Sequence, residues 1–160
     1  GITPDIIVEV PKPVAGQFPK INKLAIQEFG CGKDAIWIQE FFAFDGPEGQ
    51  YVVTYRNRHT AVSAVLSKNA ENKVQLESGT SALNVLFPWR GAWALDARLN
   101  VGNCWTTVAN VYQQDAAVAA ITELPAGQYR LFARGRQGSS TTNMLATITL
   151  GDGERKTVGL

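Results

Sequence analysis

The 160-residue sequence is poor in charge, and that shortage argues against two classes of partner. Charged residues make up 18% of the chain, whereas about 25% is usual in a globular protein. The net charge at pH 7 is +1, and no segment gathers charges of one sign. Attraction to nucleic acid or to an anionic membrane surface requires a basic patch. The sequence therefore predicts neither partner.

Long apolar runs are also missing. No segment approaches the roughly 20 apolar residues that span a bilayer as a helix, so we expect no membrane insertion. The N-terminus lacks the basic and apolar regions of a signal peptide. The first residue is Gly1 and not Met, so export from the cell stays open.

Signatures of catalysis are scarce. The one histidine, His59, follows two arginines in the sequence YRNRHT, and no nucleophile-elbow, zinc-protease or phosphate-loop motif is present. We therefore predict no catalytic residue. A glycan hydrolase remains a second alternative, because two facing carboxylates are sufficient for that reaction. The available carboxylates show no distinctive spacing: Asp34, Glu40, Asp45, Glu48, Asp96 and Asp115.

Cysteine is limited to Cys31 and Cys104, which are too few and too far apart for a zinc site. Either the two form a disulfide, which would stabilise the fold by about 4 kcal/mol, or they are buried thiols that pack as small apolar residues. No calcium-loop pattern is present, and GDGE at 151–154 is too short to indicate one. We predict no cofactor, and we leave a structural metal open.

Strand patterns, in contrast, are abundant. Alternating or short apolar segments rich in β-branched and aromatic residues recur between turn sequences such as DGPEG, LPAG and GDG. This spacing predicts an all-β sandwich or barrel. Residues 115–121, DAAVAAI, fit either a short helix or an exposed strand edge. The predicted strands are residues 6–10, 34–44, 51–56, 62–66, 74–76, 83–87, 92–99, 104–111, 129–134 and 144–150.

We expect one domain with a distinct N-terminal segment. Residues 1–33 hold four of the seven prolines, which predicts an edge strand and a proline-rich lead-in before a β-sandwich over 34–160. Two segments of the chain resemble each other, PEGQYVVTYRNR at 47–58 and PAGQYRLFARGR at 125–136; both begin P-x-G-Q-Y. Either both segments converge on favourable turn chemistry, or they are equivalent strands of two facing sheets.

Residues 104–136, CWTTVANVYQQDAAVAAITELPAGQYRLFARGR, carry a family resemblance. A tryptophan, a YQ pair on a strand and then LPAG-x-Y-x-L resemble the later half of galactose-binding-like β-sandwich modules. These modules are common carbohydrate-binding domains of secreted and surface glycan-degrading proteins. The resemblance implies a jelly-roll-like sandwich of two antiparallel sheets, often with a structural calcium, and sugar bound by loops at one end or on a concave face. It also implies an extracellular or cell-surface location.

The stretch FPWRGAW, residues 87–93, contains the parts that a sugar site needs. An aromatic ring stacks on the C–H face of a sugar, and planar polar groups hold its hydroxyls. We predict ligand contacts from Trp89 and Trp93 near a strand end, with Arg90 as donor and Asp96 and Asn100 as acceptors. The alternative is that these tryptophans anchor the core.

Paired arginines suggest a preference for acidic sugars. Arg56 and Arg58 alternate on one side of a predicted strand, as do Arg134 and Arg136 in the echoed segment. Such pairs can bind a carboxylate in two-pronged fashion, or they can belong to a solvated face. We include Arg56 and Arg58 in the predicted site.

The sequence as a whole predicts a non-catalytic carbohydrate-binding module of a secreted or surface protein. The alternative is a structural or adhesive assembly domain, such as a fibre, adhesin or surface-layer subunit, that buries its aromatic residues against protein. Either reading allows a homo-oligomer or flanking domains. An exposed Trp89 beside Arg90 in a groove would favour the binding module.

Overall fold

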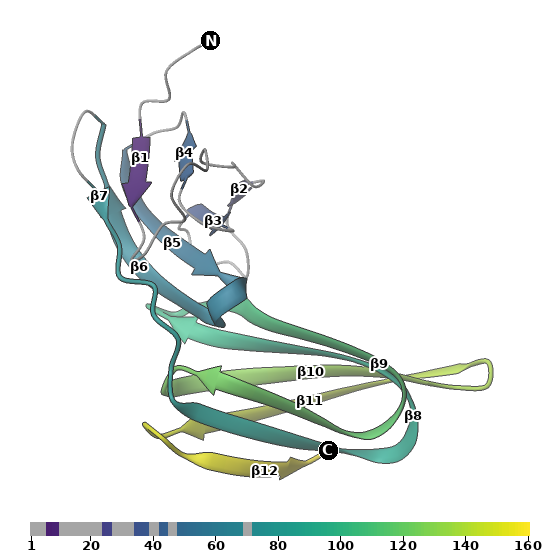
Figure 1. Cartoon of the computed structure of the whole chain (residues 1–160). Helices are drawn as coiled ribbons and strands as arrows, with labels where there is room; N and C mark the ends of the chain where they lie inside the picture. Colours follow the sequence, from purple (N-terminus) through teal and green to yellow (C-terminus); the bar gives the residue numbers. More distant parts are fainter. Residues whose placement is uncertain (1–5, 10–23, 27–33, 39–41, 45–47, 69–71) are drawn as a thin grey trace.

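The computed structural model describes residues 6–9, 24–26, 34–38, 42–44, 48–68 and 72–160, and most of them lie in β-strands. Pairing is mainly antiparallel, so the predicted all-β fold is confirmed. Within these ranges the one helical element is a 3₁₀ turn, η2 (Arg56–Arg58). The strands form three sheets (Figure 1).

Two small sheets come from the first half of the chain. One has the order β2 (Leu24–Ile26), β3 (Asp34–Ile38), β5 (Gly49–Tyr55), β6 (Thr60–Leu66), and the other has the order β4 (Phe42–Phe44), β1 (Ile6–Glu9), β7 (Asn72–Lys73). The expected edge strand at 6–10 is therefore wrong, because β1 lies between two partners. The prolines that suggested an edge lie outside β1 and remove no donor from it.

The third sheet is the largest of the three. Its members are β8 (Ser81–Val101), β9 (Cys104–Leu124), β10 (Gly127–Gln137), β11 (Ser140–Leu150) and β12 (Arg155–Gly159). β8 is central: β9 pairs with its whole length, β10 with its second half, and β12, in parallel, with its first half. β11 pairs with β10. β2 and β12 were not among the predicted strands, and residues 74–76 are not in a strand although Val74 and Leu76 are buried.

The segment FPWRGAW is a bend within β8 and not a loop between strands. Six residues of straight strand would separate Phe87 and Trp93 by about 20 Å, yet their rings stack with centroids 4.5 Å apart and 4° between planes. Pro88 has no N–H for a regular ladder, and the register with β9 shifts on both sides of Gly91. The sheet therefore folds over here.

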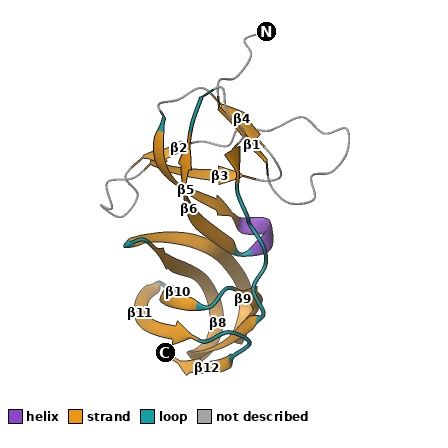
Figure 2. Cartoon of the chain, turned by 90° about the vertical axis from the view of Figure 1, so that its left-hand side faces the viewer, coloured by secondary structure: helices purple, strands orange, loops and turns teal. Residues whose placement is uncertain are grey.

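The core lies between the two halves of the folded sheet. Odd-numbered side chains of β8 are buried before the bend and again after it, and they join one cluster with the odd-numbered side chains of β10. Figure 2 shows the strands β8–β12 curving around this shared interior. The even-numbered side chains of β8 and β10 consequently point outward.

β9 settles the alternatives for residues 115–121. These residues are strand and pair with the first half of β8, with Ala119 opposite Val85. Burial of Ala119 and Ile121 follows a period of two, so the helical alternative is wrong. The β8–β9 turn consists of Gly102 and Asn103, both with positive φ (55° and 68°), as the type I′ hairpin turn requires.

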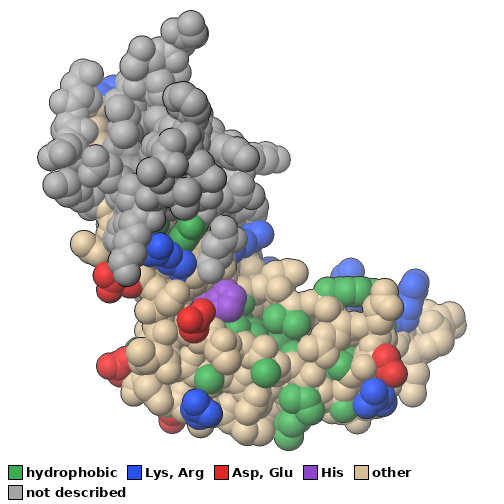
Figure 3. Space-filling model, in the orientation of Figure 1, with side chains coloured by type: hydrophobic (Ala, Val, Ile, Leu, Met, Phe, Trp, Pro, Cys, Tyr) green, Lys and Arg blue, Asp and Glu red, His purple; other side chains and the backbone are tan. Residues whose placement is uncertain are grey.

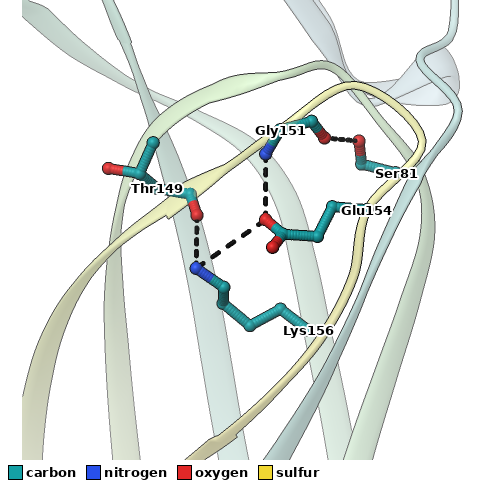
Figure 4. A network of polar contacts seen from close by, with 5 residues as sticks. All are labelled: Ser81, Thr149, Gly151, Glu154 and Lys156. Carbon is teal, nitrogen blue, oxygen red and sulfur yellow. Dashed lines mark hydrogen bonds and ion pairs between the residues drawn. The ribbon is translucent and has the colours of Figure 1, made fainter.

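A polar network fixes the connection from β11 to β12 (Figure 4). The Ser81 hydroxyl donates to the Gly151 carbonyl, and the Gly151 N–H donates to the Glu154 carboxylate at 2.9 Å. Lys156 Nζ donates to the Thr149 carbonyl at 2.6 Å and lies 3.7 Å from Glu154 Oε1. Both carboxylates of the GDGE segment are engaged by groups of the protein itself, because Asp152 accepts from the Thr80 hydroxyl at 3.0 Å and Glu154 accepts from the Gly151 N–H.

The echoed P-x-G-Q-Y segments share a turn but not the arginine arrangement. Gly49 and Gly127 have nearly equal φ values, 151° and 149°, and Tyr51 and Tyr129 are both buried at the start of a strand. The arginines that follow Tyr51 fall in η2, whereas those that follow Tyr129 stay on β10. The likeness therefore covers the turn and the first part of each strand.

Tyr129 makes folding stability sensitive to high pH. Its hydroxyl donates to the Pro125 carbonyl at 2.6 Å, and burial raises its pKa above the ordinary value. The unfolded chain ionises this group above pH about 10 and the folded chain does not, so stability is full below that pH and falls as the pH rises. We expect Tyr129→Phe to lower the free energy of unfolding by about 1 kcal/mol at neutral pH.

The same substitution should weaken the alkaline loss of stability, by up to about 1.4 kcal/mol per pH unit. Urea unfolding followed by circular dichroism at about pH 8 and about pH 11 measures both effects. Tyr112→Phe is the control, because Tyr112 is an exposed tyrosine of the same sheet. Equal alkaline slopes for Tyr129→Phe and wild type would contradict this assignment.

Candidate functional site

The outer face of the folded sheet has regular rows of side chains set by strand register. One row runs Tyr112, Ala94, Arg134, Asn143 across β9, β8, β10 and β11. The next row runs Asn110, Asp96, Phe132, Leu145. Each row combines four segments that are distant in sequence, so the pairing register alone determines which side chains meet.

A hollow of about 420 Å³ lies on these two rows. It forms because Ala94, on the central strand, is short while the side chains on the flanking strands are long. The Asp96 carboxylate accepts a hydrogen bond from the Asn110 amide, and Arg134 Nε donates to Asn143 Oδ1 at 3.1 Å. The lining residues are Ala94, Asp96, Asn110, Phe132, Ala133, Arg134, Asn143 and Met144.

A second hollow, of about 280 Å³, continues the first toward the bend of β8. The two hollows share Ala94 and Arg134, and the second adds Ala92, Tyr112, Arg136 and Thr141. The Tyr112 side chain is 66% exposed. We call the residues that line the two hollows the outer-face groove. It offers an alanine floor, one accessible aromatic ring, two guanidinium groups and one carboxylate.

Arginines and aromatic rings also stack farther along the same face. The Arg98 guanidinium lies 4.0 Å from the centre of the Phe132 ring, and the Arg130 guanidinium lies 4.0 Å from the Trp105 ring. These cation–π contacts hold the rings against the sheet. The groove therefore has one end where the rings are already covered and one end, at Tyr112, where a ring is open to a ligand.

The predicted tryptophan site is not formed. Trp93 is 1% exposed, stacks on Phe87 and donates from Nε1 to the Trp89 carbonyl at 3.0 Å. Trp89 is partly buried and packs against Trp93, with centroids 4.8 Å apart. Trp93 is thus a core residue, and Trp89 covers it. The reason is the bend, which turns both indoles to the inside of the folded sheet.

The polar members of the predicted site have separate locations. Arg90 is exposed and pairs with Asp115 at 2.8 Å, beside the bend. Asn100 donates to Gln128 at 3.1 Å at the far end of the outer face. Of the residues predicted around FPWRGAW, Asp96 alone lines the outer-face groove.

Arg56 and Arg58 lie away from the groove as well. Arg56 Nε donates to the Thr107 carbonyl and Arg58 Nη1 to the Leu76 carbonyl, each at 3.3 Å. They therefore join η2 to neighbouring segments instead of lying free on one strand face. His59 follows η2, and its Nδ1 lies 2.8 Å from the Thr122 carbonyl. This imidazole has a structural contact and faces no carboxylate of the groove.

The part of the chain that the structure describes contains no group of three histidine, cysteine or acidic side chains that could hold a metal ion. No helix in those ranges is long and apolar enough to cross a membrane. Figure 3 shows acidic and basic side chains scattered over the visible face of the β8–β12 part, without a large patch of one sign. Comparisons with protein-family models, curated proteins and solved structures found no match to the chain.

Proposed function

We propose that the protein is a non-catalytic carbohydrate-binding module and that the glycan lies in the outer-face groove. The observation that carries this proposal is the continuity of the two hollows through Ala94 and Arg134, beside the exposed Tyr112 ring. An open, shallow strip suits an extended chain of sugars better than a single buried ligand. The proposed site is therefore on the outer face of the sheet and not at the bend of β8, where the sequence predicted it.

The chemistry of the groove matches a carboxylated glycan. The Tyr112 ring can stack on the C–H face of a sugar, while Asp96 and Asn143 hold hydroxyl groups. Arg134 and Arg136 lie on the same face of β10 and give the lining two positive charges against the one negative charge of Asp96. An arginine pair binds carboxylates in two-pronged fashion. We therefore expect uronate-containing glycans to bind better than neutral ones.

The proposal includes a fold family and a location for the protein. A sheet folded into two layers and a glycine turn that begins β10 support a jelly-roll-like, galactose-binding-like module. Cys104 is disulfide-bonded, and such bonds persist mainly in oxidising compartments. This supports an extracellular or cell-surface location.

The hydrolase alternative receives less support from the groove. Glycoside hydrolysis needs two carboxylates about 5–10 Å apart on either side of the scissile bond. Asp96 is the one carboxylate among the described residues that line the groove, and it already accepts from Asn110.

The test is a binding assay on polyuronates, such as polygalacturonate and alginate, beside neutral galactan. We expect Tyr112→Ala to weaken binding to both classes about five- to tenfold through lost stacking. Arg134→Ala should weaken binding to polyuronates about 10- to 100-fold through the lost charge-assisted bonds. With Arg134→Ala, the affinity for neutral glycans should fall less than the affinity for polyuronates.

Arg90→Ala is the matched control, because Arg90 is an exposed arginine of the same sheet outside both hollows. Its affinity should equal that of wild type. Loss of binding with Arg90→Ala and none with Arg134→Ala would place the ligand at the bend of β8 and overturn the proposed site. Absence of binding to every glycan would overturn the function itself.

A further inference from the structure

The β11 strand is an open sheet edge with an unusual composition. Among the described residues it pairs with β10 alone, over the whole of Ser140–Leu150. Its sequence, STTNMLATITL, contains no charged residue and no proline. Natural proteins commonly protect such edges with charges, proline or bulges. The two other edge strands of the same sheet carry charged residues: β9 has Asp115 and Glu123, and β12 has Arg155 and Lys156.

The direction of the backbone groups on β11 follows from the turn before it. Gln137 pairs with Ser140 across two residues, and Gly138 at the first of them has φ 60°, as in a type II′ hairpin. The closing pair of such a hairpin exchanges both hydrogen bonds, and bonded pairs alternate from there. The pair Phe132 and Leu145 is then a non-bonded one. Leu145 therefore directs its N–H and C=O to the open edge.

The contact of Lys156 agrees with this alternation. Its ammonium donates to the carbonyl of Thr149 (Figure 4), a residue an even number of positions from Leu145, so this carbonyl is directed away from β10 as that of Leu145 is. Because Lys156 already occupies the Thr149 carbonyl, the part of the β11 edge that is open to a partner strand ends at Thr149. The free portion is centred on Leu145, whose side chain is 62% exposed.

We propose that two copies of this chain pair antiparallel through β11 about a two-fold axis at Leu145. In this register Leu145 lies opposite Leu145 of the second copy, and Asn143 lies opposite Thr147. No like charges face each other, and the exposed leucines cover one another. A leucine pair and polar uncharged pairs are favourable cross-strand combinations. The self-complementary strand is what a two-fold interface requires.

Pairing of this kind would join the outer faces of the two copies into one surface. Asn143 and Thr141 lie on β11 and line the groove, so the two grooves would meet across the axis. If the proposed function holds, one extended glycan could contact both copies and gain affinity through avidity. The dimer itself does not depend on glycan binding, and its test needs no glycan.

The test is sedimentation of the full chain across the micromolar range. We expect a monomer–dimer equilibrium in which Leu145→Lys raises the dissociation constant at least about tenfold, because it places like charges opposite each other and removes the leucine contact. Val65→Lys is the control, since Val65 is an exposed apolar strand residue on β6. Circular dichroism of both variants checks that the fold is retained.

A cysteine variant locates the axis. Cα atoms of a directly opposed bonded pair are about 5.5 Å apart, which lies within the range that a disulfide accepts. Leu145→Cys should therefore give a covalent dimer under mild oxidation, and Val65→Cys should not. A chain that stays monomeric at all concentrations would overturn the proposal. A dimer that neither Leu145 variant affects would overturn it too, because another surface would then form the interface.

Discussion

Replacing Trp93 with alanine is expected to lower the free energy of unfolding by about 3–5 kcal/mol. The indole is 1% exposed, stacks on Phe87 and donates to the Trp89 carbonyl. It also fills the space above Gly135, where a Cβ atom would lie 2.4 Å from the ring. The substitution therefore removes the side chain that holds the two halves of β8 together at the bend.

Urea unfolding followed by circular dichroism measures this loss, with Trp105→Ala as the matched control. Trp105 is the same residue type in the same sheet, but it is partly exposed under Arg130 on the outer face. Trp105→Ala should lower the free energy of unfolding by clearly less, on the order of 1 kcal/mol. Equal losses for the two variants would show that the bend does not depend on the stacked indole.

Several strands were predictable from the sequence, but the bend was not, and residues 34–44, predicted as one strand, contain β3 and β4 of two different sheets. The period-two alternation of apolar residues, together with the turn residues, predicts β5, β6, β10 and β11 to within a few residues. Pro88 and Gly91 indicate an interruption, but they do not reveal that the strand continues on the far side. What decides between a loop and a bent strand is the contact between Phe87 and Trp93, which exists once the sheet has folded over.

Most of the outer-face groove could not be predicted from the sequence. Its floor is alanine, which has no distinctive chemistry, and its row of Tyr112, Ala94, Arg134 and Asn143 comes from four strands. The pairing of Arg134 with Arg136 on one face was visible in the alternation of β10. The sequence favoured the tryptophans instead, because a large aromatic residue beside arginine and glycine is typical both of a binding platform and of a core anchor.

Removal of the disulfide at Cys104 is the other change with a large expected effect. Cys104 is 3% exposed at the β8–β9 turn and is disulfide-bonded. Cys31, the other cysteine of the chain, lies outside the described residues. A cross-link between the two closes a long loop, and loss of its constraint on the unfolded chain should lower the free energy of unfolding by about 4 kcal/mol. The expected outcome is that Cys104→Ala shows this loss in urea unfolding under oxidising conditions.

A double-mutant cycle separates the bond from the packing of each sulfur. If the two cysteines are joined, Cys31→Ala should cost about as much as Cys104→Ala, and the double variant should cost little more than either, since one covalent bond is lost in all three. A reductant should destabilise wild type and leave the variants unchanged. Two additive and small losses, with free thiols titratable in urea before reduction, would contradict the bond. They would also remove the support that an oxidising compartment gives to the proposed extracellular location, because reduced thiols are the usual state inside cells.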